Sequence, residues 1–594
     1  PDDNRARIVH VAEGNPLFVE QLAAMLAEDQ SLDTIPPTIN ALLTARLDRL
    51  TAEERNVVER AAVAGKEFWR DAVADLTPEN ERSVVGSALM SLVRKDLIRP
   101  HRSTERADDA FRFSHALIRD AAYAGIAKQA RASLHEAFAR WLERAGATKD
   151  VSEIVGYHLE QAFRYRTELG AVDDAAKALG ARAAELLGNA GRRALARSDI
   201  PAAVNLLERS AGLSRAASGE EPPEVLLDLG TALHHAGDLV RADAVLTAAT
   251  DEAEARRDAA QSERARIEQS ALRLYLDPDV DLDDVRARAR AAITTFEQSR
   301  DELGLAKAWR LLGDVDWARL RLTEMQASLE EALAHAKRAG DQREASEIVR
   351  GLCRVALLGP MPVDDAIRRC RATLERDRDD LGLQATVQEV LSVLVAAKGR
   401  FTEARELLDR ARRSYQELGL GRRVVTMYGA FVDLLADDAA AAETQLRRAF
   451  DALKAIGEHA ELSTTAALLA LVLCELDRFD EAEQFADAAE RSSSPGDIAT
   501  NVIIRRARAK ILAAHGDAGG AAELARAAVQ LAEQTDWLQL HADALVDLAE
   551  LQHGLGRAGA AERCVQAAIS LYEAKGIDVA AERARSRFSE LVGT

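Results

Sequence analysis

The sequence predicts an all-α fold, and three observations favour it. Alanine, the residue with the best helix propensity, occupies about one position in five, whereas proline occurs only 13 times in 594 residues. Hydrophobic residues make up 47% of the chain, enough to bury a large core, which argues against disorder. Aromatic residues make up only 4%, which argues against a β-sandwich or barrel. At about 150 residues per domain, the length predicts several domains or one long array.

Turn residues recur at an even spacing through most of the chain. Short turns follow amphipathic helical stretches, and neighbouring turns lie 38 to 43 residues apart. They fall near Ser198, Gly237, Asp277, Leu320, Gly359, Gly399, Asp437, Asp477, Gly516 and Gly556. Independent turns would not keep such a spacing. We therefore predict a repeat array of about ten units, each of about 40 residues, over residues 178–594.

A small residue fixes the register of these units. Five residues after the turn, seven units carry alanine, which lets the second helix approach the first closely. These residues are Ala203, Ala242, Ala404, Ala442, Ala482, Ala521 and Ala561. The pattern resembles the tetratricopeptide repeat, whose usual period is about 34 residues. The resemblance implies an α-α superhelical solenoid with a concave groove for a protein or small-molecule ligand. Asp277-Pro278-Asp279 and Gly359-Pro360-Met361-Pro362 depart from the pattern.

The residues before the array follow a different pattern. Residues 1–30 carry an amphipathic helix signal, and Pro36-Pro37 then interrupts the chain. Within residues 31–145, several helices, one of them capped by Thr51, precede two short alternating segments. These segments are Leu97-Ile98-Arg99 and Phe111-Arg112-Phe113, and another helix follows them. The order of helix, two-stranded wing and helix predicts a winged-helix module, and residues 146–177 are expected to form connecting helices.

Four segments resemble the C-terminal part of STAND signalling ATPases. Gly14-Asn15-Pro16-Leu17-Phe18 is similar to the end of their ATPase helical subdomain, and residues 35–50 are similar to the next helix. Residues 111–123 resemble their winged-helix signature, and residues 134–143 resemble the helix after it. The likeness is greatest to bacterial proteins that join an adenylate/guanylate cyclase, this ATPase and tetratricopeptide repeats. Large LuxR-type regulators share the ATPase and the repeats.

The resemblance implies that four residues contact a nucleotide. In this family ADP or ATP sits between the P-loop domain, the helical subdomain and the winged helix. Gly14, Asn15 and Pro16 match the segment beside the nucleotide, and His115 matches a histidine that reaches the β-phosphate. A helix N-terminus favours such an anion. The alternatives are that His115 caps its own helix and that Pro16 merely begins one.

The sequence lacks the motifs of a catalytic centre. No GxxxxGK followed by Ser or Thr occurs, and Ala64-Gly65-Lys66-Glu67 lacks both the first glycine and the hydroxyl residue. No GxSxG motif occurs, and the cyclase domain is absent. We therefore expect no catalytic residue, no metal site, no enzyme activity and no tight nucleotide binding by this chain alone. ATP or ADP would bind in a full-length parent, an ATPase with a nucleotide cyclase effector.

The net charge and the cysteine content limit the partners and the cellular location that the sequence predicts. The net charge is -20, and an acidic chain repels nucleic acid overall. Four separate cysteines predict a reducing, cytoplasmic location, and no run of 18 apolar residues predicts a membrane span. Pairs of Asp and Glu are expected on solvated helix faces. The five tryptophans are expected to anchor helices together, or to act as ligand hot spots if they line the groove.

Three functional hypotheses follow. The first is the sensor and regulatory portion of a STAND signal transducer, contacting upstream ATPase and effector domains and forming an oligomer on activation. Ligand in the repeat groove would then control a nucleotide switch that drives a cyclase. The second is a fragment of a LuxR-type transcriptional regulator, which would need a DNA-binding domain that these residues do not contain. The third is a free-standing tetratricopeptide scaffold for protein interactions.

Overall fold

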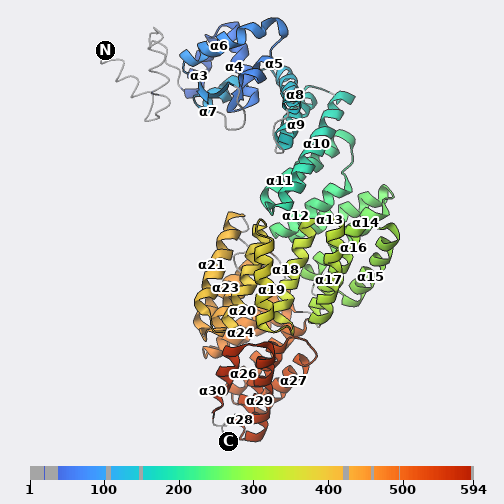
Figure 1. The fold of residues 1–594 in the computed structure, drawn as a ribbon, viewed down its shortest axis with the longest axis vertical. Helices are drawn as coiled ribbons and strands as arrows, with labels where there is room; N and C mark the ends of the chain where they lie inside the picture. The colour runs from blue at the N-terminus through green and yellow to red at the C-terminus, as the bar shows by residue number, and fades with distance from the viewer. Residues whose placement is uncertain are drawn as a thin grey trace, which may run out of the picture. The chain divides into compact units, whose positions relative to one another are not determined.

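The structure is a computed structural model that describes Val19 and residues 38–101, 109–145, 151–170, 172–277, 279–418, 427–456, 460–493 and 496–589. The chain divides into two compact units, residues 1–190 with 209–220 and residues 191–208 with 221–594. We call the first the N-terminal module and the second the repeat array. Helices dominate the described part of both (Figure 1), as the sequence predicted. None of the described helices combines the length and the apolar character that a membrane crossing requires.

The N-terminal module begins with short helices around a small sheet. Thr51 forms the predicted cap, because its hydroxyl accepts from the Glu54 N–H while the Glu54 carboxylate accepts from the Thr51 N–H. The apolar side chains share one core that includes Phe68, Leu89 and Phe111. The elements are α3 (Ile39–Asp48), α4 (Ala52–Ala64), β1 (Glu67–Trp69), α5 (Arg70–Asp75), the 3-10 helix η2 (Glu79–Val84), α6 (Val85–Arg94), β2 (Ile98–His101), β3 (Ala110–Phe113) and α7 (Ala116–Gly125).

The sheet has three antiparallel strands, whereas the sequence predicted two. Strands β2 and β3 pair as expected, with Ile98 opposite Phe113. Strand β1 pairs with the other edge of β3 and places Phe68 opposite Phe111, so the strand order is β1-β3-β2. Glu67-Phe68-Trp69 is too short to show an alternating pattern of its own. Phe68 is fully buried against the rings of Phe111 and Phe113, so packing defines this strand.

Two longer helices, α8 (Lys128–Arg144) and α9 (Val151–Leu169), bury a chain of neutral polar groups. His135 Nδ1 lies 2.8 Å from His158 Nδ1, and His135 Nε2 lies 2.8 Å from the Tyr123 hydroxyl. That hydroxyl lies 3.0 Å from the hydroxyl of Tyr165. Burial lowers the pKa of His135 to about 2 and the pKa of His158 to about 3. Both imidazoles are therefore neutral near pH 7.

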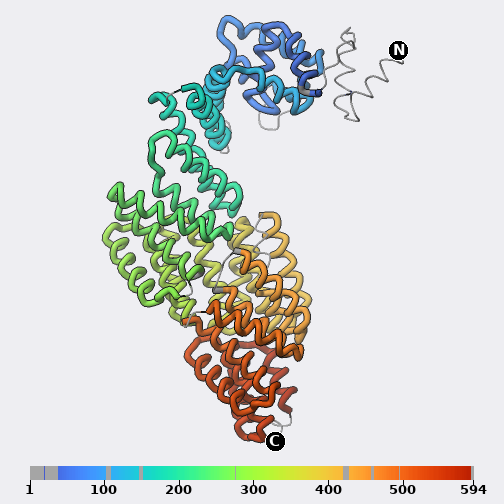
Figure 2. Tube along the Cα trace, turned by 180° about the vertical axis from the view of Figure 1, so that it is seen from behind, coloured from blue at the N-terminus to red at the C-terminus, as the bar shows by residue number. Residues whose placement is uncertain are grey.

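The repeat array consists of antiparallel helix pairs that stack side by side (Figure 2). Helices α10 (Asp174–Ala196) and α11 (Ile200–Ser218) contribute residues to both units. The remaining helices are α12 (Pro223–Ala236), α13 (Leu239–Ala255), α14 (Ala259–Leu276), α15 (Leu282–Ser299), α16 (Glu302–Ala318), α17 (Leu322–Ala339), α18 (Gln342–Leu358), α19 (Val363–Arg376), α20 (Leu381–Ala397), α21 (Phe401–Glu417), α22 (Tyr428–Leu435), α23 (Ala439–Ile456), α24 (Ala460–Glu475), α25 (Phe479–Ser492), α26 (Ile498–Ala514), α27 (Ala518–Ala532), α28 (Leu538–Gly554), α29 (Ala558–Lys575) and α30 (Asp578–Arg587).

The predicted turns join the two helices of each pair. Eight of the ten turn residues have a left-handed backbone, with φ from 51° at Leu320 to 89° at Gly516. The two exceptions, Asp277 and Gly359, are those whose sequence departs from the repeat pattern, and their φ values are -113° and -72°. The seven alanines that follow the turns are fully buried, with no exposed surface. The close helix approach inferred from them is therefore confirmed.

The array closes on itself, which its sequence did not indicate. In a simple solenoid each repeat contacts only its neighbours. Here α14 packs against α24, and α20 packs against α30. The Thr323 N–H donates to the Asp536 carboxylate over 2.9 Å, and the Asp536 N–H donates to the Leu320 carbonyl. Lys398 forms an ion pair of 2.6 Å with Asp578. One apolar cluster consequently joins residues 349–435 to residues 542–588.

The closure explains the irregular turn at Gly359. The side chain of Lys575, at the end of α29, is buried, and its ammonium group donates to three backbone carbonyls. These belong to Ala356, Gly359 and Met361, at distances of 3.0, 2.6 and 2.6 Å. Three acceptors match the three N–H donors of an ammonium group. The turn therefore presents its carbonyls to a distant helix and does not take the left-handed form of the other turns.

Candidate ligand-binding channel

Four neighbouring cavities lie in the repeat array, and we call them together the inner channel. Each neighbouring pair of cavities shares lining residues. The histidine pocket shares His235 and Arg350 with the arginine cavity, which shares Asp314 and Tyr428 with the tryptophan cavity. Phe431 and Trp537 line both the tryptophan cavity and the C-terminal cavity. The volumes in this order are about 20, 310, 230 and 770 Å³.

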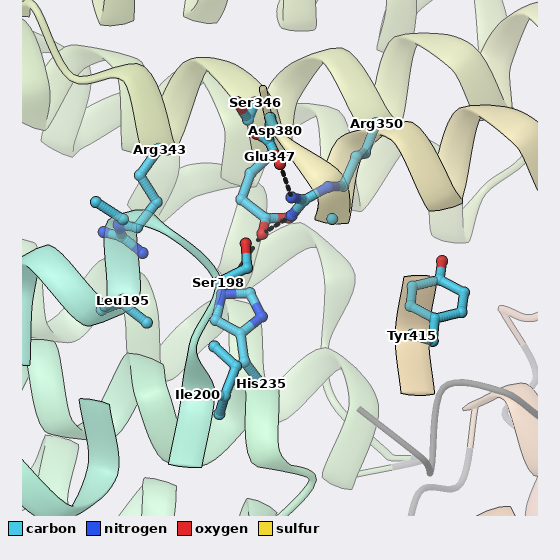
Figure 3. A pocket seen from close by; sticks show the side chains of 12 residues that line it. Leu195, Ser198, Ile200, His235, Arg343, Ser346, Glu347, Arg350, Asp380 and Tyr415 are labelled. Carbon is cyan, nitrogen blue, oxygen red and sulfur yellow. Dashed lines mark hydrogen bonds and ion pairs between the residues drawn. The ribbon is translucent and has the colours of Figure 1, made fainter. Parts of the chain in front are cut away.

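The histidine pocket lies where the first turn of the array meets α18 and α20. Figure 3 shows Arg350 between Glu347 and Asp380, with which it forms ion pairs. His235 Nε2 lies 3.5 Å from the Glu347 carboxylate. Asp380 also caps α20, because its carboxylate accepts from the Leu383 N–H over 2.9 Å. The pocket is therefore held by charged groups from three helices, and its small volume leaves room for about one water molecule.

Charged side chains from α14, α16 and α18 surround the arginine cavity. Lys307 Nζ lies 2.6 Å from the Glu268 carboxylate, and Arg310 lies 3.1 Å from the same carboxylate. Arg310 also lies 2.6 Å from Glu344. Burial alone would raise the pKa of Glu268, but the two cations outweigh it and lower that pKa. Burial raises the pKa of Asp314, which lies 3.6 Å from Arg310.

The tryptophan cavity has a largely apolar lining that also includes acidic groups. Trp317, Leu357, Phe431 and Trp537 belong to the apolar part. The Arg354 guanidinium lies over the Trp317 ring, 5.5 Å from its centroid. The polar lining residues include the carboxylates Asp277, Asp314, Glu461 and Asp497 and the hydroxyls of Ser463, Thr464 and Ser492.

Paired charges also line the C-terminal cavity. The Asp547 carboxylate lies 2.6 Å from Arg506 and 2.8 Å from Lys510. Burial would raise the pKa of Asp547, but these two cations outweigh it and lower that pKa. The neighbouring Asp543 accepts a hydrogen bond of 2.5 Å from the Tyr572 hydroxyl, and burial raises its pKa. The α26 and α28 side chains thus form a compact charged cluster beside an open space.

Three of the four residues predicted to contact a nucleotide lie outside the described residues. These are Gly14, Asn15 and Pro16. His115 is exposed at the start of α7, where its Nδ1 accepts from the Leu117 N–H over 3.2 Å. The geometry is that of a helix N-cap, which was the alternative reading of this residue. No group of metal-ligating side chains occurs among the described residues.

The lining of the channel includes buried acidic residues that the sequence analysis did not single out. Among them are Glu268, Glu344 and Asp547. A signal was present: Lys307 stands between Ala306 and Ala308, and Asp547 stands between Val546 and Leu548. A charged residue within an apolar helical stripe is buried only when it is paired. The tryptophans fall into two groups. Trp317 and Trp537 line a cavity, whereas Trp69 stacks on Trp141 in the N-terminal module.

Comparisons with known proteins find similar solved structures but no related sequence. The sequence matches no protein-family model and no curated protein. The structure is similar to the APC/C hetero-tetramer Cut9–Hcn1, with 13% identity, 79% of this chain and 92% of that chain covered, and a TM-score of 0.44. It is also similar to a Rap protein complexed with competence and sporulation factor, with 13% identity, coverage of 62% and 99%, and a TM-score of 0.45.

A third similar structure is a STAND protein with a tetratricopeptide repeat sensor from Pyrococcus horikoshii. The identity is 13%, the coverage is 99% of this chain and 72% of that chain, and the TM-score is 0.28. With TM-scores below 0.5, these likenesses carry no inference about function. The array's own geometry is that of a helical solenoid built from tetratricopeptide-like pairs.

Proposed function

We propose that this chain is the sensor and regulatory portion of a longer signal-transducing protein, and that its array binds an extended peptide in the inner channel. The observation that supports this most is the adjacency of the cavities. They share lining residues from the histidine pocket to the C-terminal cavity, so an elongated ligand bound there would contact several of them. An extended peptide offers backbone groups and side chains at regular intervals, which suits such a row of cavities.

The closure of the array supplies the element that a ligand could switch. Lys575 and Arg583 hold the last helices against earlier ones through backbone carbonyls of residues 356–361 and 434–435. A ligand inside the channel touches helices on both sides of these contacts. If it binds the open or the closed form better, it shifts the balance between them by that difference in affinity. The change in the array is the signal passed to the rest of the protein.

The N-terminal module fits the winged helix of a STAND protein. Its helix α4, strand β1, helices α5 and α6, and strands β2 and β3 follow the order of a winged helix, and the strand order β1-β3-β2 is that of its sheet. In the parent protein, ATP or ADP would bind upstream residues, with Gly14, Asn15, Pro16 and His115 at the edge of the nucleotide site. This chain alone would bind nucleotide weakly and catalyse nothing, and a nucleotide cyclase would be the effector.

A selection of peptides tests the sensor proposal. We expect the chain to enrich a subset of a random peptide pool, and the enriched peptides to bind with a 1:1 stoichiometry in calorimetry. The variant Ala318→Phe narrows the tryptophan cavity and should weaken this binding at least about tenfold. The matched control is Ala255→Phe, at an exposed position that ends α13. Equal binding by both variants would place the peptide outside the channel and contradict the proposal.

A further inference from the structure

The tryptophan cavity is built to receive an apolar group. Trp317 and Trp537 both pack against the apolar cluster of α16, α17 and α18. Leu357 and Phe431 complete the wall, and the cavity measures about 230 Å³. This volume accommodates one aromatic ring with a short attached chain. An aromatic ligand between indole rings gains both burial and ring contacts.

The charged lining of this cavity is mostly acidic. Asp277, Asp314, Glu461 and Asp497 line it, and Arg354 is the cation among the described lining residues. Arg354 lies over the Trp317 ring, and its charge acts on Asp314. A ligand cation is therefore favoured in this cavity, and an anion is disfavoured.

Asp497 is the carboxylate best placed to bind a ligand cation. Its carboxylate accepts from the Thr500 N–H over 3.0 Å and from the Ser463 hydroxyl over 3.3 Å. Both donors are neutral, and no ion pair joins Asp497 to any described Lys, Arg or His. Burial raises its pKa. By contrast, Glu268 and Asp547, in the neighbouring cavities, each have two cationic partners. The cavity thus combines an aromatic wall with a carboxylate that has no counter-ion among the described residues.

We propose that the tryptophan cavity binds an aromatic or branched apolar group that carries a protonated amine. This inference rests on the proposed function and names the chemistry of the ligand's anchor. The amine pairs with Asp497 beside the Ser463 hydroxyl, and the apolar group lies against Trp317 and Trp537. Two sources supply this chemistry: the N-terminal residue of a peptide, and a free amino-acid amide.

Three probes that share the phenylalanine skeleton and differ in charge test the proposal in the unmodified chain. Phenylalaninamide is cationic at about pH 7, because an α-amino group is still mostly protonated there. N-acetylphenylalaninamide is neutral and N-acetylphenylalanine is anionic. In calorimetry we expect the cationic probe to bind at least about tenfold more tightly than the neutral probe, and the anionic probe to bind most weakly. Equal affinities, or preference for the anion, would overturn the proposal.

A charge-neutralising variant locates the cation site. Asp497→Asn should remove most of the preference for phenylalaninamide and leave the affinity for the neutral probe unchanged. The matched control is Asp480→Asn, which makes the same change at an exposed position of α25 outside the channel. An unchanged preference in Asp497→Asn would contradict the role of this carboxylate. If that variant does not fold by circular dichroism, the three probes in the unmodified chain decide the question.

Peptide probes separate this inference from the proposed function. A short peptide with a free N-terminal phenylalanine should bind at least as tightly as phenylalaninamide, and its N-acetylated form should bind at least about tenfold more weakly. Binding of the amide but not of the peptide would support the anchor chemistry and contradict the peptide sensor. Binding of peptides regardless of N-terminal charge would support the sensor and overturn the anchor.

Discussion

The α8–α9 pair of the N-terminal module and the interior of the repeat array bury different kinds of polar group. The pair buries a neutral chain of His135, His158 and Tyr123 between packed helices. The array buries ion pairs such as Glu268 with Lys307, beside cavities of several hundred Å³. Elsewhere in the module Glu54 is buried too, and it pairs with Lys95. A buried charge is tolerated only when it is paired, so the cavities of the inner channel lie in a region whose interior depends on ion pairs.

The largest expected effect comes from breaking a charged contact of the array. Lys307→Met leaves Glu268 with one cationic partner in a buried site, and we expect it to reduce the free energy of unfolding of the array by about 3 kcal/mol. Urea denaturation checks this. The double variant with Glu268→Gln should recover much of the loss. Arg338→Met, which removes an exposed partner of Glu302, should cost less than about 1 kcal/mol. Equal losses of unfolding free energy in Lys307→Met and Arg338→Met would show that the buried ion pair contributes no more than the exposed one.

The second-largest loss of stability should come from breaking the Lys575 contact that closes the array. Lys575→Met removes the ammonium that three backbone carbonyls accept, and we expect a loss of about 2 kcal/mol. Hydrogen exchange should rise in residues 356–362 and in α29, with little change in the N-terminal module. Lys337→Met, at an exposed position in the last turn of α17, is the control. Unchanged exchange at residues 356–362 would mean that this contact does not hold the array closed.

Lowering the pH should destabilise the N-terminal module before it destabilises the repeat array. The pKa values of His135 and His158 are lower in the folded module than their ordinary value of 6.5, so the unfolded chain binds protons more tightly. The stability they confer is present above pH 6.5 and falls as the pH drops, by about 2 kcal/mol at pH 5 for one imidazole. The pKa values of Glu268 and Asp547 are lowered in the folded array, so the stability that these carboxylates confer is lost only below about pH 4.5. Protection from hydrogen exchange, corrected for the intrinsic exchange rate at each pH, should therefore fall at pH 5 in α8 and α9 but not in α16 or α28.

The smallest loss of stability should come from removing a helix cap at the surface, and it should be similar in the two regions. Thr51→Ala removes the cap of α4 in the module, and Asp238→Ala removes the cap of α13 in the array. Each should cost about 1 kcal/mol. Similar losses in thermal unfolding would confine the contrast to the interiors. A loss several times larger at one cap would show that the two regions also differ at their surfaces.

The repeat pattern could be predicted because it depends on local chemistry. The even spacing of turns and the buried alanines, such as Ala442, follow from how two neighbouring helices meet. Contacts across long stretches of sequence left no such pattern. The ammonium of Lys575 meets the carbonyl of Gly359 through the curvature of the whole array, which no single unit encodes. The irregular turn at Gly359 was visible in the sequence, but its reason became clear only with its partner.

In the candidate site, too, local features could be predicted from the sequence and long-range contacts could not. Trp317 and Trp537 were recognised as anchors or hot spots, yet only the closed array brings them to one cavity. Strand β1 was missed because three residues cannot show a period. Asp497 gave no signal at all, since an aspartate before a helix reads as a cap, and it is one. Its second role depends on which charges are absent around it in space.

Hydrogen exchange with and without a selected peptide tests the central claim most directly, namely that the array binds its ligand in the inner channel. We predict protection in the channel-lining helices α16, α18, α24 and α28, with little change in the outer helices α19 and α27, which contribute no residue to these cavities. Protection confined to those outer helices, or to the N-terminal module, would contradict the claim.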